Sequence, residues 1–286
     1  MQPPTAWETS RYGLETDHFV EYVRRSGPYT MQSDHFHSYY EIYYLLSGKR
    51  IYFVKDRTYT VEQGDLVFIA KNELHKTLHA GESGHERVVI HFGDAFIRER
   101  GGPHAKLLLS PFEQKSHVIR LPLAEQKAVA GTIRRIVAEI RNKPPGYELT
   151  PAAGIVELLL ATARYLLDNE PVPVFDSTPL HAKISEIVRY LNEHYHEPVK
   201  LGGVAESFFI SPYYLSRMFK EVTGFAFSDY LILTRIKEAQ RLLRDSEATI
   251  AEIASSVGFD NFSHFGKTFK KITRQSPREF RKAMRS

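Results

Sequence analysis

The sequence contains no cysteine. This absence excludes disulfide bonds, thiolate zinc sites, cysteine nucleophiles and sensing by thiol oxidation. Any bound metal must therefore take histidine and carboxylate ligands. The sequence also lacks a run of about 18 apolar residues, and its start, MQPPTAWETSRYGLE, has no basic segment followed by an apolar core. We therefore expect no transmembrane helix, no secretory signal, no membrane partner and a cytoplasmic location.

An excess of positive charge is absent outside the C-terminal third. Residues 180–286 hold 17 Lys and Arg against 12 Asp and Glu, whereas residues 1–179 hold 21 against 22. A basic segment beside a near-neutral remainder indicates that one end of the molecule meets a polyanion. Taken alone, a basic run is equally typical of a solvated surface.

Residues 38–92 are rich in tyrosine, valine and isoleucine, and turn-forming stretches such as SGKR, EQGD and HAGESGHE interrupt them. Short β-favouring runs between close turns are typical of an antiparallel sandwich or barrel. The predicted strands are residues 39–46, 50–54, 57–61, 65–70 and 86–92.

After about residue 121 the apolar residues recur at helical spacing, which predicts two helices separated by the helix-breaking sequence NKPPG. The apolar positions are Leu123, Val129, Ile133, Ile136, Val137 and Ile140 in the first helix, and Ile155, Leu158, Leu159, Thr162 and Leu166 in the second. These faces must be buried on the preceding domain or on a partner subunit, and we favour a partner. NEPVPVFDSTP, at residues 169–179, holds three prolines and predicts an extended linker.

An internal repeat occupies the C-terminal third. SPYYLSRMFKEVTGFAFSDY at residues 211–230 aligns with NFSHFGKTFKKITRQSPREF at residues 261–280. Just upstream, LGGVA at residues 201–205 resembles IAEIA at residues 250–254. The matched pairs include Leu215 and Phe265, Phe219 and Phe269, Lys220 and Lys270, Thr223 and Thr273, and Tyr230 and Phe280.

Each copy has the pattern of a helix-turn-helix. A short helix ending near Ala205 or Ala254 leads through a turn to a second helix, which Ser211 or Asn261 caps. Gly258 supplies the turn of the second copy. The first copy has SFFIS there, one residue shorter and without glycine, so the sequence does not determine its turn.

The outward side chains of the two second helices predict DNA binding. Arg217 and Lys267 occupy equivalent places, from which they can read guanine in the major groove. Lys220 and Lys270 come later in each helix, where contact with backbone phosphates is expected. A solvated polar face is the alternative for one such helix, and the repeat favours DNA binding. The predicted DNA-binding residues are Ser211, Tyr213, Ser216, Arg217 and Lys220 in the first copy, and Asn261, Ser263, His264, Lys267 and Lys270 in the second.

Between the copies, FSDYLILTRIKEAQRLLRDS at residues 227–246 predicts a single helix with apolar positions at Leu231, Ile236, Ala239 and Leu243. Such a helix holds the two motifs at a fixed separation. Both recognition helices are then expected to enter successive major-groove segments on one face of the DNA, about 34 Å apart.

Residues 183–283 resemble the DNA-binding domain of the AraC/XylS family of bacterial transcription regulators. YLSRMFKEVTG and IAEIASSVGFDNFSHFGKTFKKITRQSPREFRK carry the resemblance, and the second segment follows the family signature nearly throughout. One departure is Arg274, where the family usually has glycine. This arginine either alters the end of the recognition helix or adds a phosphate contact.

The N-terminal part resembles the cupin-type sensing domain of many members of this family. The metal-cupin pattern, His-x-His with a glutamate four residues later and a glycine seven beyond, is satisfied by His35, His37, Glu41 and Gly48. His75 occupies the histidine position in the second half of the pattern. His35, His37, Glu41 and His75 can together form a three-histidine, one-carboxylate site suited to Zn, Ni, Mn or Fe(II).

Because side chains alternate along a strand, His35, His37, Tyr39, Glu41 and Tyr43 share one face if the strand is regular. These residues either line a pocket for an organic effector without metal, or bind a divalent metal, or are structural polar groups near the barrel mouth. The resemblance favours the first interpretation, with no cofactor required. The surrounding tyrosines favour a carbohydrate effector, although packing in the strand core is the simpler interpretation of any single one. The predicted effector-binding residues are His35, His37, Tyr39, Glu41, Tyr43 and His75.

These observations predict an α+β chain. A cupin-like antiparallel β-barrel (1–120) is followed by an amphipathic helix pair for dimerisation (121–168) and a linker (169–180). An all-α DNA-binding domain with two helix-turn-helix motifs joined by a linker helix completes it (181–286). The predicted function is a ligand-responsive, sequence-specific transcriptional regulator that binds double-stranded DNA as a homodimer.

The resemblance implies an activator that contacts RNA polymerase. The alternative is a cupin metalloenzyme, of dioxygenase or isomerase type, tethered to DNA. A DNA-repair methyltransferase, another role linked to this DNA-binding domain, requires a cysteine acceptor that the chain does not have.

Overall fold

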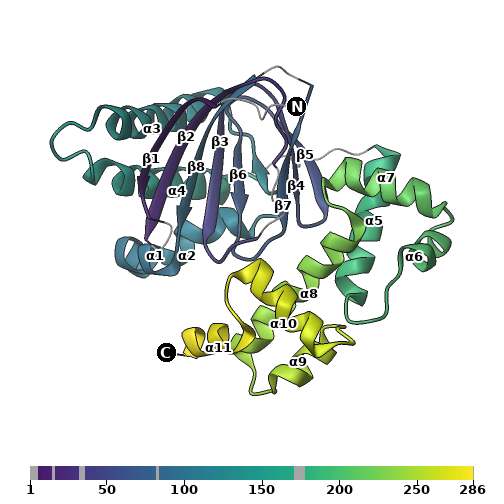
Figure 1. Cartoon of the computed structure of the whole chain (residues 1–286). Coiled ribbons are helices and arrows are strands. Elements are labelled where there is room, and N and C mark those ends of the chain that lie inside the picture. Colours follow the sequence, from purple (N-terminus) through teal and green to yellow (C-terminus); the bar gives the residue numbers. More distant parts are fainter. Residues whose placement is uncertain (1–5, 15–16, 32–35, 82–83, 171–177, 286) are drawn as a thin grey trace. The chain divides into compact units, whose positions relative to one another are not determined.

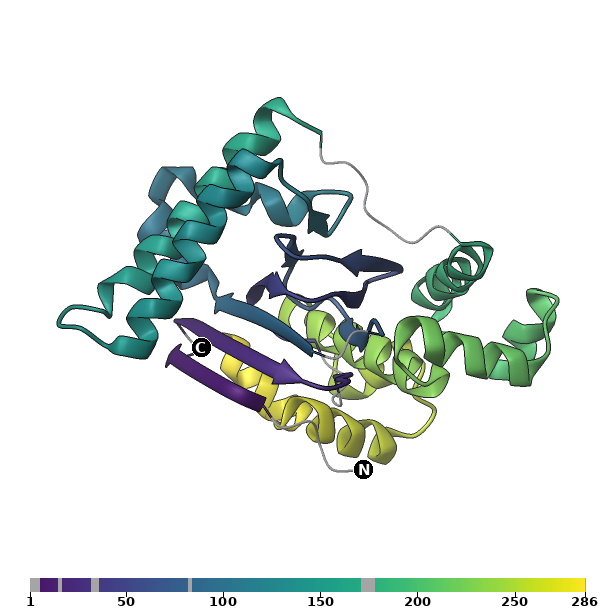
Figure 2. The same ribbon diagram turned by 90° about the horizontal axis from the view of Figure 1, so that it is seen from above.

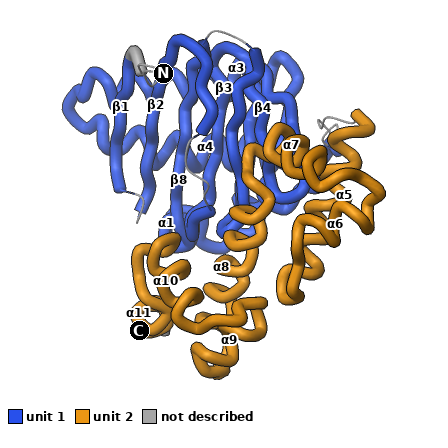
Figure 3. The backbone as a smooth tube through the Cα atoms, turned by 45° about the vertical axis from the view of Figure 1, so that its right-hand side comes forward, with its two compact units in different colours: residues 1–176 blue, residues 177–286 orange. Residues whose placement is uncertain are grey.

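The computed structural model describes residues 6–14, 17–31, 36–81, 84–170 and 178–285. The chain divides into two compact units, residues 1–176 and 177–286, which Figure 3 shows in different colours. This division falls within the stretch predicted as a linker. Residues 171–177 of that stretch lie outside the described residues.

Unit 1 is built on two antiparallel sheets (Figure 1). The larger sheet has the strand order β1-β2-β8-β3-β6-β9, and the smaller has the order β5-β4-β7. The strands are β1 (Ala6–Gly13), β2 (His18–Ser26), β3 (Tyr40–Ser47), β4 (Arg50–Val54), β5 (Arg57–Val61), β6 (Leu66–Ile69), β7 (His75–His79), β8 (Gly84–Phe92) and β9 (Val118–Ile119).

All five predicted strands form, with their ends shifted by at most two residues. Four further strands, β1, β2, β7 and β9, were not predicted. β7 is HKTLH, which does not have the β-branched composition of a typical strand, whereas β2 carries Phe19, Val20 and other strand-favouring residues before its two arginines. β7 forms because it pairs with β4, which overrides its weak intrinsic preference, and β2 pairs with β8 along its whole length.

Alternate side chains of the larger sheet enter two different cores. Ile42 and Tyr44 of β3 pack on the outer face, whereas Tyr43 and Leu45 pack in the interior between the two sheets. Figures 1 and 2 show the helices of unit 1 gathered along the outer face of the larger sheet. The helical segments of unit 1 are α1 (Asp94–Gly101), η1 (Gly102–His104), α2 (Ala105–Leu109), η2 (Ser110–Glu113), α3 (Leu123–Asn142) and α4 (Leu149–Asp168).

The apolar faces of α3 and α4 are buried within unit 1. Ile136 and Ile155 are fully buried in the core that α3 and α4 share with the sheet. The two helices approach closely at Gly154, where a Cβ would lie 2.6 Å from Cδ1 of Ile136. The expectation that a partner subunit covers these faces is therefore wrong, because the outer face of the sheet and the facing helix cover them.

α4 is long and apolar enough to cross a membrane by length and composition alone. In unit 1, 44% of its apolar window is buried, and a core helix of a globular domain passes the same test. Its packing on α3 is sufficient to explain its composition.

Unit 2 is entirely helical in its described residues, 178–285. α8 matches the predicted linker helix and packs against both α7 and α10. Its 19 residues span about 28 Å. The helices are α5 (Pro179–His194), α6 (Leu201–Ser207), α7 (Pro212–Thr223), α8 (Phe227–Asp245), α9 (Ile250–Ser256), α10 (Phe262–Thr273) and α11 (Pro277–Arg285).

Two helix-turn-helix motifs form, α6–α7 and α9–α10, and the predicted caps are confirmed. The Ser211 side chain accepts a hydrogen bond from the backbone N–H of Tyr214 (3.2 Å). The Asn261 side chain accepts one from the N–H of His264 (2.8 Å).

The turn of the first motif, which the sequence left open, has the same geometry as that of the second. Phe209 (φ +57°) and Gly258 (φ +89°) occupy equivalent left-handed positions. In each motif the next residue donates its N–H to the carbonyl five residues earlier. The extra residue of the second copy is Asp260, which follows the turn.

Candidate functional site

All ten side chains predicted to bind DNA are exposed in unit 2. Their helices are held by fully buried inner residues, Leu215 and Phe219 in α7 and Phe265 and Phe269 in α10. The hydrophobic repeat at i and i+4 therefore turns the intervening polar residues outward, as predicted.

The outward faces of α7 and α10 carry basic side chains without acidic partners. Among the described residues, Arg217, Lys220, Lys267 and Lys270 form no ion pair. On α7 the exposed residues form an open hollow of about 390 Å³, lined by Tyr213, Ser216, Arg217, Lys220 and Glu221. Unpaired cations on a recognition helix are suited to phosphate oxygens and to guanine edges.

Besides the predicted Tyr213, two further exposed aromatic side chains lie at the start of these helices and were not predicted. Tyr214 is 46% exposed on α7, and Phe262 is 57% exposed on α10. The signal was present, because the i, i+4 pattern of buried residues excludes both positions from the core. Both residues lie in the first turn of the helix that carries the basic side chains.

A second group of polar side chains surrounds Glu41 in the interior of unit 1. One carboxylate oxygen of Glu41 lies 3.2 Å from Nε2 of His37, 2.9 Å from Nε2 of His91 and 3.8 Å from Nε2 of His75. The other accepts a hydrogen bond from the Tyr52 hydroxyl (3.4 Å). Glu41 is therefore the centre of the site.

Histidines keep Glu41 ionised despite its burial. Burial raises the pKa of this carboxyl group, but the His37 hydrogen bond, the charge of His75 and the His91 hydrogen bond outweigh it and hold the pKa well below its usual value. Burial, together with the charge of Glu41, raises the pKa of Tyr52 well above its usual value. The site thus presents a buried anion ringed by imidazoles and a neutral phenol.

Five of the six predicted effector-binding residues are described, and they differ in their relation to Glu41. His35 lies outside the described residues. Tyr39 stacks on His37, with ring centroids 3.9 Å apart. Tyr43 faces the same interior, where its ring packs edge-on against Tyr52 (4.9 Å).

His91 is the functional candidate that the sequence analysis missed. It lies opposite Glu41 in the pairing of β3 with β8, which places both side chains on the interior face. The strand containing it was predicted, and alternation from the interior residue Val89 would have identified its direction. Only the register between two strands about fifty residues apart brings it to Glu41.

The donor set at Glu41 fits a divalent metal of the zinc class. Potential ligand atoms of His37, Glu41 and His91 all lie within 4.8 Å of one another. His37 and His75 each direct Nδ1 to a backbone carbonyl, at 2.9 Å and 2.8 Å, which leaves Nε2 on the side of Glu41. Fixing one ring nitrogen in this way is the usual arrangement for a metal-binding histidine.

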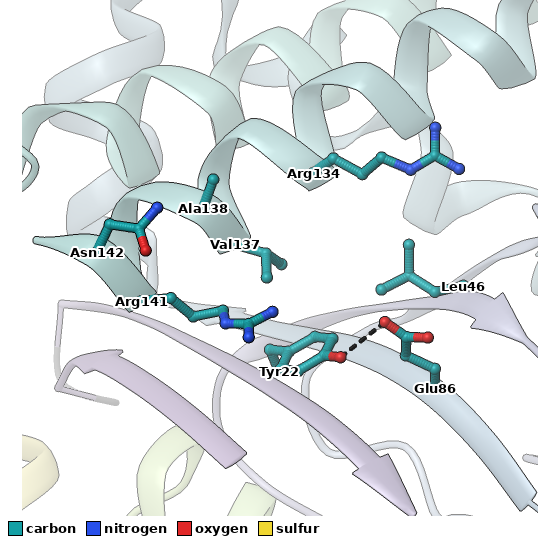
Figure 4. A pocket seen from close by; sticks show the side chains of 8 residues that line it. All are labelled: Tyr22, Leu46, Glu86, Arg134, Val137, Ala138, Arg141 and Asn142. Carbon is teal, nitrogen blue, oxygen red and sulfur yellow. Dashed lines mark hydrogen bonds between the residues drawn. The ribbon is translucent and has the colours of Figure 1, made fainter. Parts of the chain in front are cut away.

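The outer face of unit 1 carries a hollow of about 340 Å³ between α3 and the sheet. Figure 4 shows Tyr22 and Glu86 joined by a hydrogen bond, with Arg141 beside Tyr22 and Arg134 farther along the helix. Arg141 also pairs with Glu8. The hollow contains charges of both signs and lies on the opposite side of the sheet from Glu41.

Comparison with known families identifies both units. The model of the AraC-like ligand binding domain matches residues 20–149, and that of a helix-turn-helix domain matches residues 204–283. The HTH-type transcriptional activator RhaS of Escherichia fergusonii is 27% identical over 248 residues, 87% of each chain. RhaS of Citrobacter koseri is 27% identical over 255 residues, 89% of each chain.

Among solved structures, the C-terminal domain of AraT, a response regulator from Geobacillus stearothermophilus, is similar to part of the chain. It is 34% identical and covers 37% of this chain and 88% of its own, with a TM-score of 0.36.

Proposed function

This chain belongs to the AraC/XylS family of transcriptional regulators, and from that premise we propose that it activates transcription in response to a carbohydrate-derived effector bound inside unit 1. It is a ligand-responsive, DNA-binding regulator and not an enzyme, since its relatives are transcriptional activators. The metalloenzyme alternative is therefore not favoured. The exposed, unpaired basic faces of two capped recognition helices carry the assignment of the DNA-binding residues.

We assign base reading to Arg217 and Lys267 and phosphate contact to Lys220 and Lys270. Arg217→Ala and Lys267→Ala should each weaken operator binding by about 1–3 kcal/mol and relax specificity at one base pair. Binding would be measured by selecting operators from random DNA and titrating them in gel-shift assays. Lys127→Ala, which removes an exposed lysine of unit 1, is the matched control and should change nothing.

An equal loss of affinity on specific and random DNA would instead make Arg217 and Lys267 phosphate contacts. Unchanged affinity in both variants would remove α7 and α10 from the DNA interface.

The polar side chains around Glu41, namely His37, Tyr52, His75 and His91, form with it the Glu41 group, which is the proposed effector site. A buried carboxylate with a hydroxyl neighbour is suited to the hydroxyl groups of a sugar. The RhaS relatives are themselves activators, and this favours activation through contact with RNA polymerase.

We further propose a homodimer in the cytoplasm. The leucines at the ends of α3 and α4, Leu123, Leu149 and Leu167, are 68%, 77% and 70% exposed and are candidates for that interface. Light scattering on a Leu149→Ser/Leu167→Ser variant would test it through the molar mass.

A second proposal is that His37, Glu41, His75 and His91 hold a divalent metal such as zinc. The convergence of their donor atoms supports it. The metal would supply a Lewis-acidic anchor for effector oxygens. Elemental analysis of purified protein should give near-stoichiometric metal in the wild type and none in Glu41→Gln or His91→Ala. Equal metal content in all three proteins would contradict the proposal.

A further inference from the structure

Three arginines form a second polar cluster between the sheets of unit 1. Arg25 comes from β2, Arg50 from β4 and Arg87 from β8, and we call them the arginine cluster. Arg50 is only 2% exposed, and the side chain of Arg87 is 14% exposed. The sequence pattern of the cupin-type site does not include these three arginines.

Strand alternation points the cluster into the interior. Along β8, Val88 and Ile90 pack in the outer core beneath the helices, so Arg87 faces inward. Arg50 shares a face of β4 with Tyr52, which lies in the interior core. Arg25 pairs with His85, two residues before Arg87 on the same face of β8.

The three side chains come together although they belong to different sheets. The guanidinium carbon of Arg25 lies 3.8 Å from the ring centre of Tyr29, and that of Arg50 lies 5.6 Å from the same ring. Burial, followed by the charges of Arg50, Arg87 and Arg25, lowers the pKa of His85 to about 3. His85 is therefore neutral near pH 7 and adds no further charge.

Acceptors for these cations are too few. Glu21 accepts from Arg87 (2.6 Å) but also from Arg11 (2.7 Å). Within the described part of the chain, neither Arg25 nor Arg50 has a carboxylate partner. Burial lowers the pKa of Arg50. For Arg87, burial has the same effect, but Glu21 outweighs it and raises the pKa.

Several donors in and beside the cluster are buried and have no hydrogen-bond partner among the residues that the structure describes. They are Nε of Arg25, Nε and Nη2 of Arg50, Nη1 of Arg87 and the hydroxyl of Tyr43. A buried guanidinium without an anion is unfavourable, and its planar N–H groups match a carboxylate or phosphate. The outer hollow of Figure 4 differs, because it is open to solvent and Glu8 pairs with its Arg141.

We propose that the arginine cluster, with the Tyr43 hydroxyl, binds an anionic group of the effector, a carboxylate or a phosphate. The inference rests on the proposed function and narrows the effector to a sugar acid or a sugar phosphate. Tyr52 connects the two polar groups, since its ring packs on Tyr43 and its hydroxyl donates to Glu41. The cluster thus selects the charge, and the Glu41 group selects hydroxyls.

Hydrogen exchange by mass spectrometry on the full chain tests this proposal. The first probes are sodium phosphate and sodium acetate, each compared with sodium chloride at equal ionic strength. The readout is restricted to peptides containing β4 and β8, because unit 2 also binds phosphate groups. The anions should slow exchange there in the wild type. The matched control, Arg134→Met, removes an arginine of the outer hollow that forms no ion pair with any described residue, and it should respond like the wild type.

Arg50→Met should need at least about tenfold more anion for the same protection, because it loses charge-assisted hydrogen bonds. Its exchange without anion should be no faster than in the wild type, since a buried unpaired charge is removed. If this variant does not fold, the more exposed Arg25→Met takes its place. Glucose, glucuronate and glucose 6-phosphate then separate the sources: glucuronate protection identifies a sugar acid, and glucose 6-phosphate protection a sugar phosphate.

Absence of anion-dependent protection in the wild type, or equal protection in Arg50→Met, would overturn the proposal and leave the cluster hydrated and structural. Stronger protection by glucose than by either charged sugar would also overturn it. Operator binding by the wild type keeps this failure distinct from failure of the proposed function. Specific binding without anion protection removes only the inference, whereas loss of specific binding removes the regulator assignment.

Discussion

The two helix-turn-helix motifs have helices of equal length but left-handed residues of different types. α6 and α9 have 7 residues each, and α7 and α10 have 12 each. In the first motif, the turn holds Phe209 at φ +57° and the recognition helix ends at Gly224 at φ +79°. In the second, the turn holds Gly258 at φ +89° and the helix ends at Arg274 at φ +66°.

The difference shows that the space around a turn, rather than the motif itself, decides where glycine is required. A Cβ on Gly258 would lie 2.9 Å from the carbonyl oxygens of Tyr195 and His196 and from Nη2 of Arg235. Phe209 instead projects into solvent and is 94% exposed. A left-handed L-residue costs about 1–2 kcal/mol, which is tolerable only where its Cβ has room.

Arg235 explains why the second turn is crowded. From α8 it donates to the carbonyl of Tyr195 and to that of Glu197, both at 2.7 Å. These carbonyls follow the end of α5, so Arg235 joins α8 to this segment beside Gly258. The second turn therefore lies against a fixed group of carbonyl oxygens, whereas the Cβ of Phe209 points into solvent.

Among the substitutions that test this difference between the motifs, Gly258→Ala should change the stability of unit 2 most. The strain of φ +89° and the overlap with fixed carbonyl oxygens should destabilise unit 2 by about 2–4 kcal/mol. Native-state hydrogen exchange of α9 and α10 in the full chain would measure the loss. Gly203→Ala is the control, because its Cβ meets nothing within 4 Å in the helix α6 and should stabilise by about 0.5–1 kcal/mol. Equal effects of the two changes would refute the role of crowding.

The exposed polar face of α7 and α10, proposed to bind DNA, could be predicted because it depends on local sequence. Ser211 and Asn261 cap helices whose apolar period is contained in about three turns, and the repeat supplies the same pattern twice. The turn at Phe209 was left open because a positive φ at phenylalanine has no local signal. It became visible only in the backbone hydrogen bonds that it shares with Gly258.

The interior of unit 1 could be predicted only in part. His37 and Glu41 are close in sequence, and their pattern identified the site. His91 and the arginine cluster depend on strand register, because residues from β2, β4 and β8 meet only after the sheets form. The preference for a partner subunit at α3 and α4 was wrong because the surface that covers an apolar face also depends on tertiary structure. Periodicity identifies an apolar face but not the surface that covers it.

Phe209→Gly should change stability in the opposite direction from Gly258→Ala. Relief of the left-handed strain, about 1–2 kcal/mol, outweighs the extra chain entropy of glycine, about 0.5–1 kcal/mol. The net stabilisation of α6 and α7 should be about 0.5–1 kcal/mol by native-state hydrogen exchange. Because the ring is 94% exposed, no packing is lost with it. A destabilised variant would mean that Phe209 has a partner surface in the full assembly.

Arg274→Gly should give the smallest change in stability and a separate change in DNA affinity. Glycine relieves strain at φ +66°, but the arginine also places positive charge at the end of α10, which is favourable by about 0.3–1 kcal/mol. These contributions and the entropy of glycine nearly cancel, so unit 2 should change by less than about 0.5 kcal/mol. The salt dependence of operator binding decides between the two roles of this residue. A slope reduced by about one, with equal losses on all sequences, makes Arg274 a phosphate contact. An unchanged salt dependence means that Arg274 only ends the recognition helix. The second motif then tolerates the left-handed strain at Arg274 although this residue adds nothing to DNA binding.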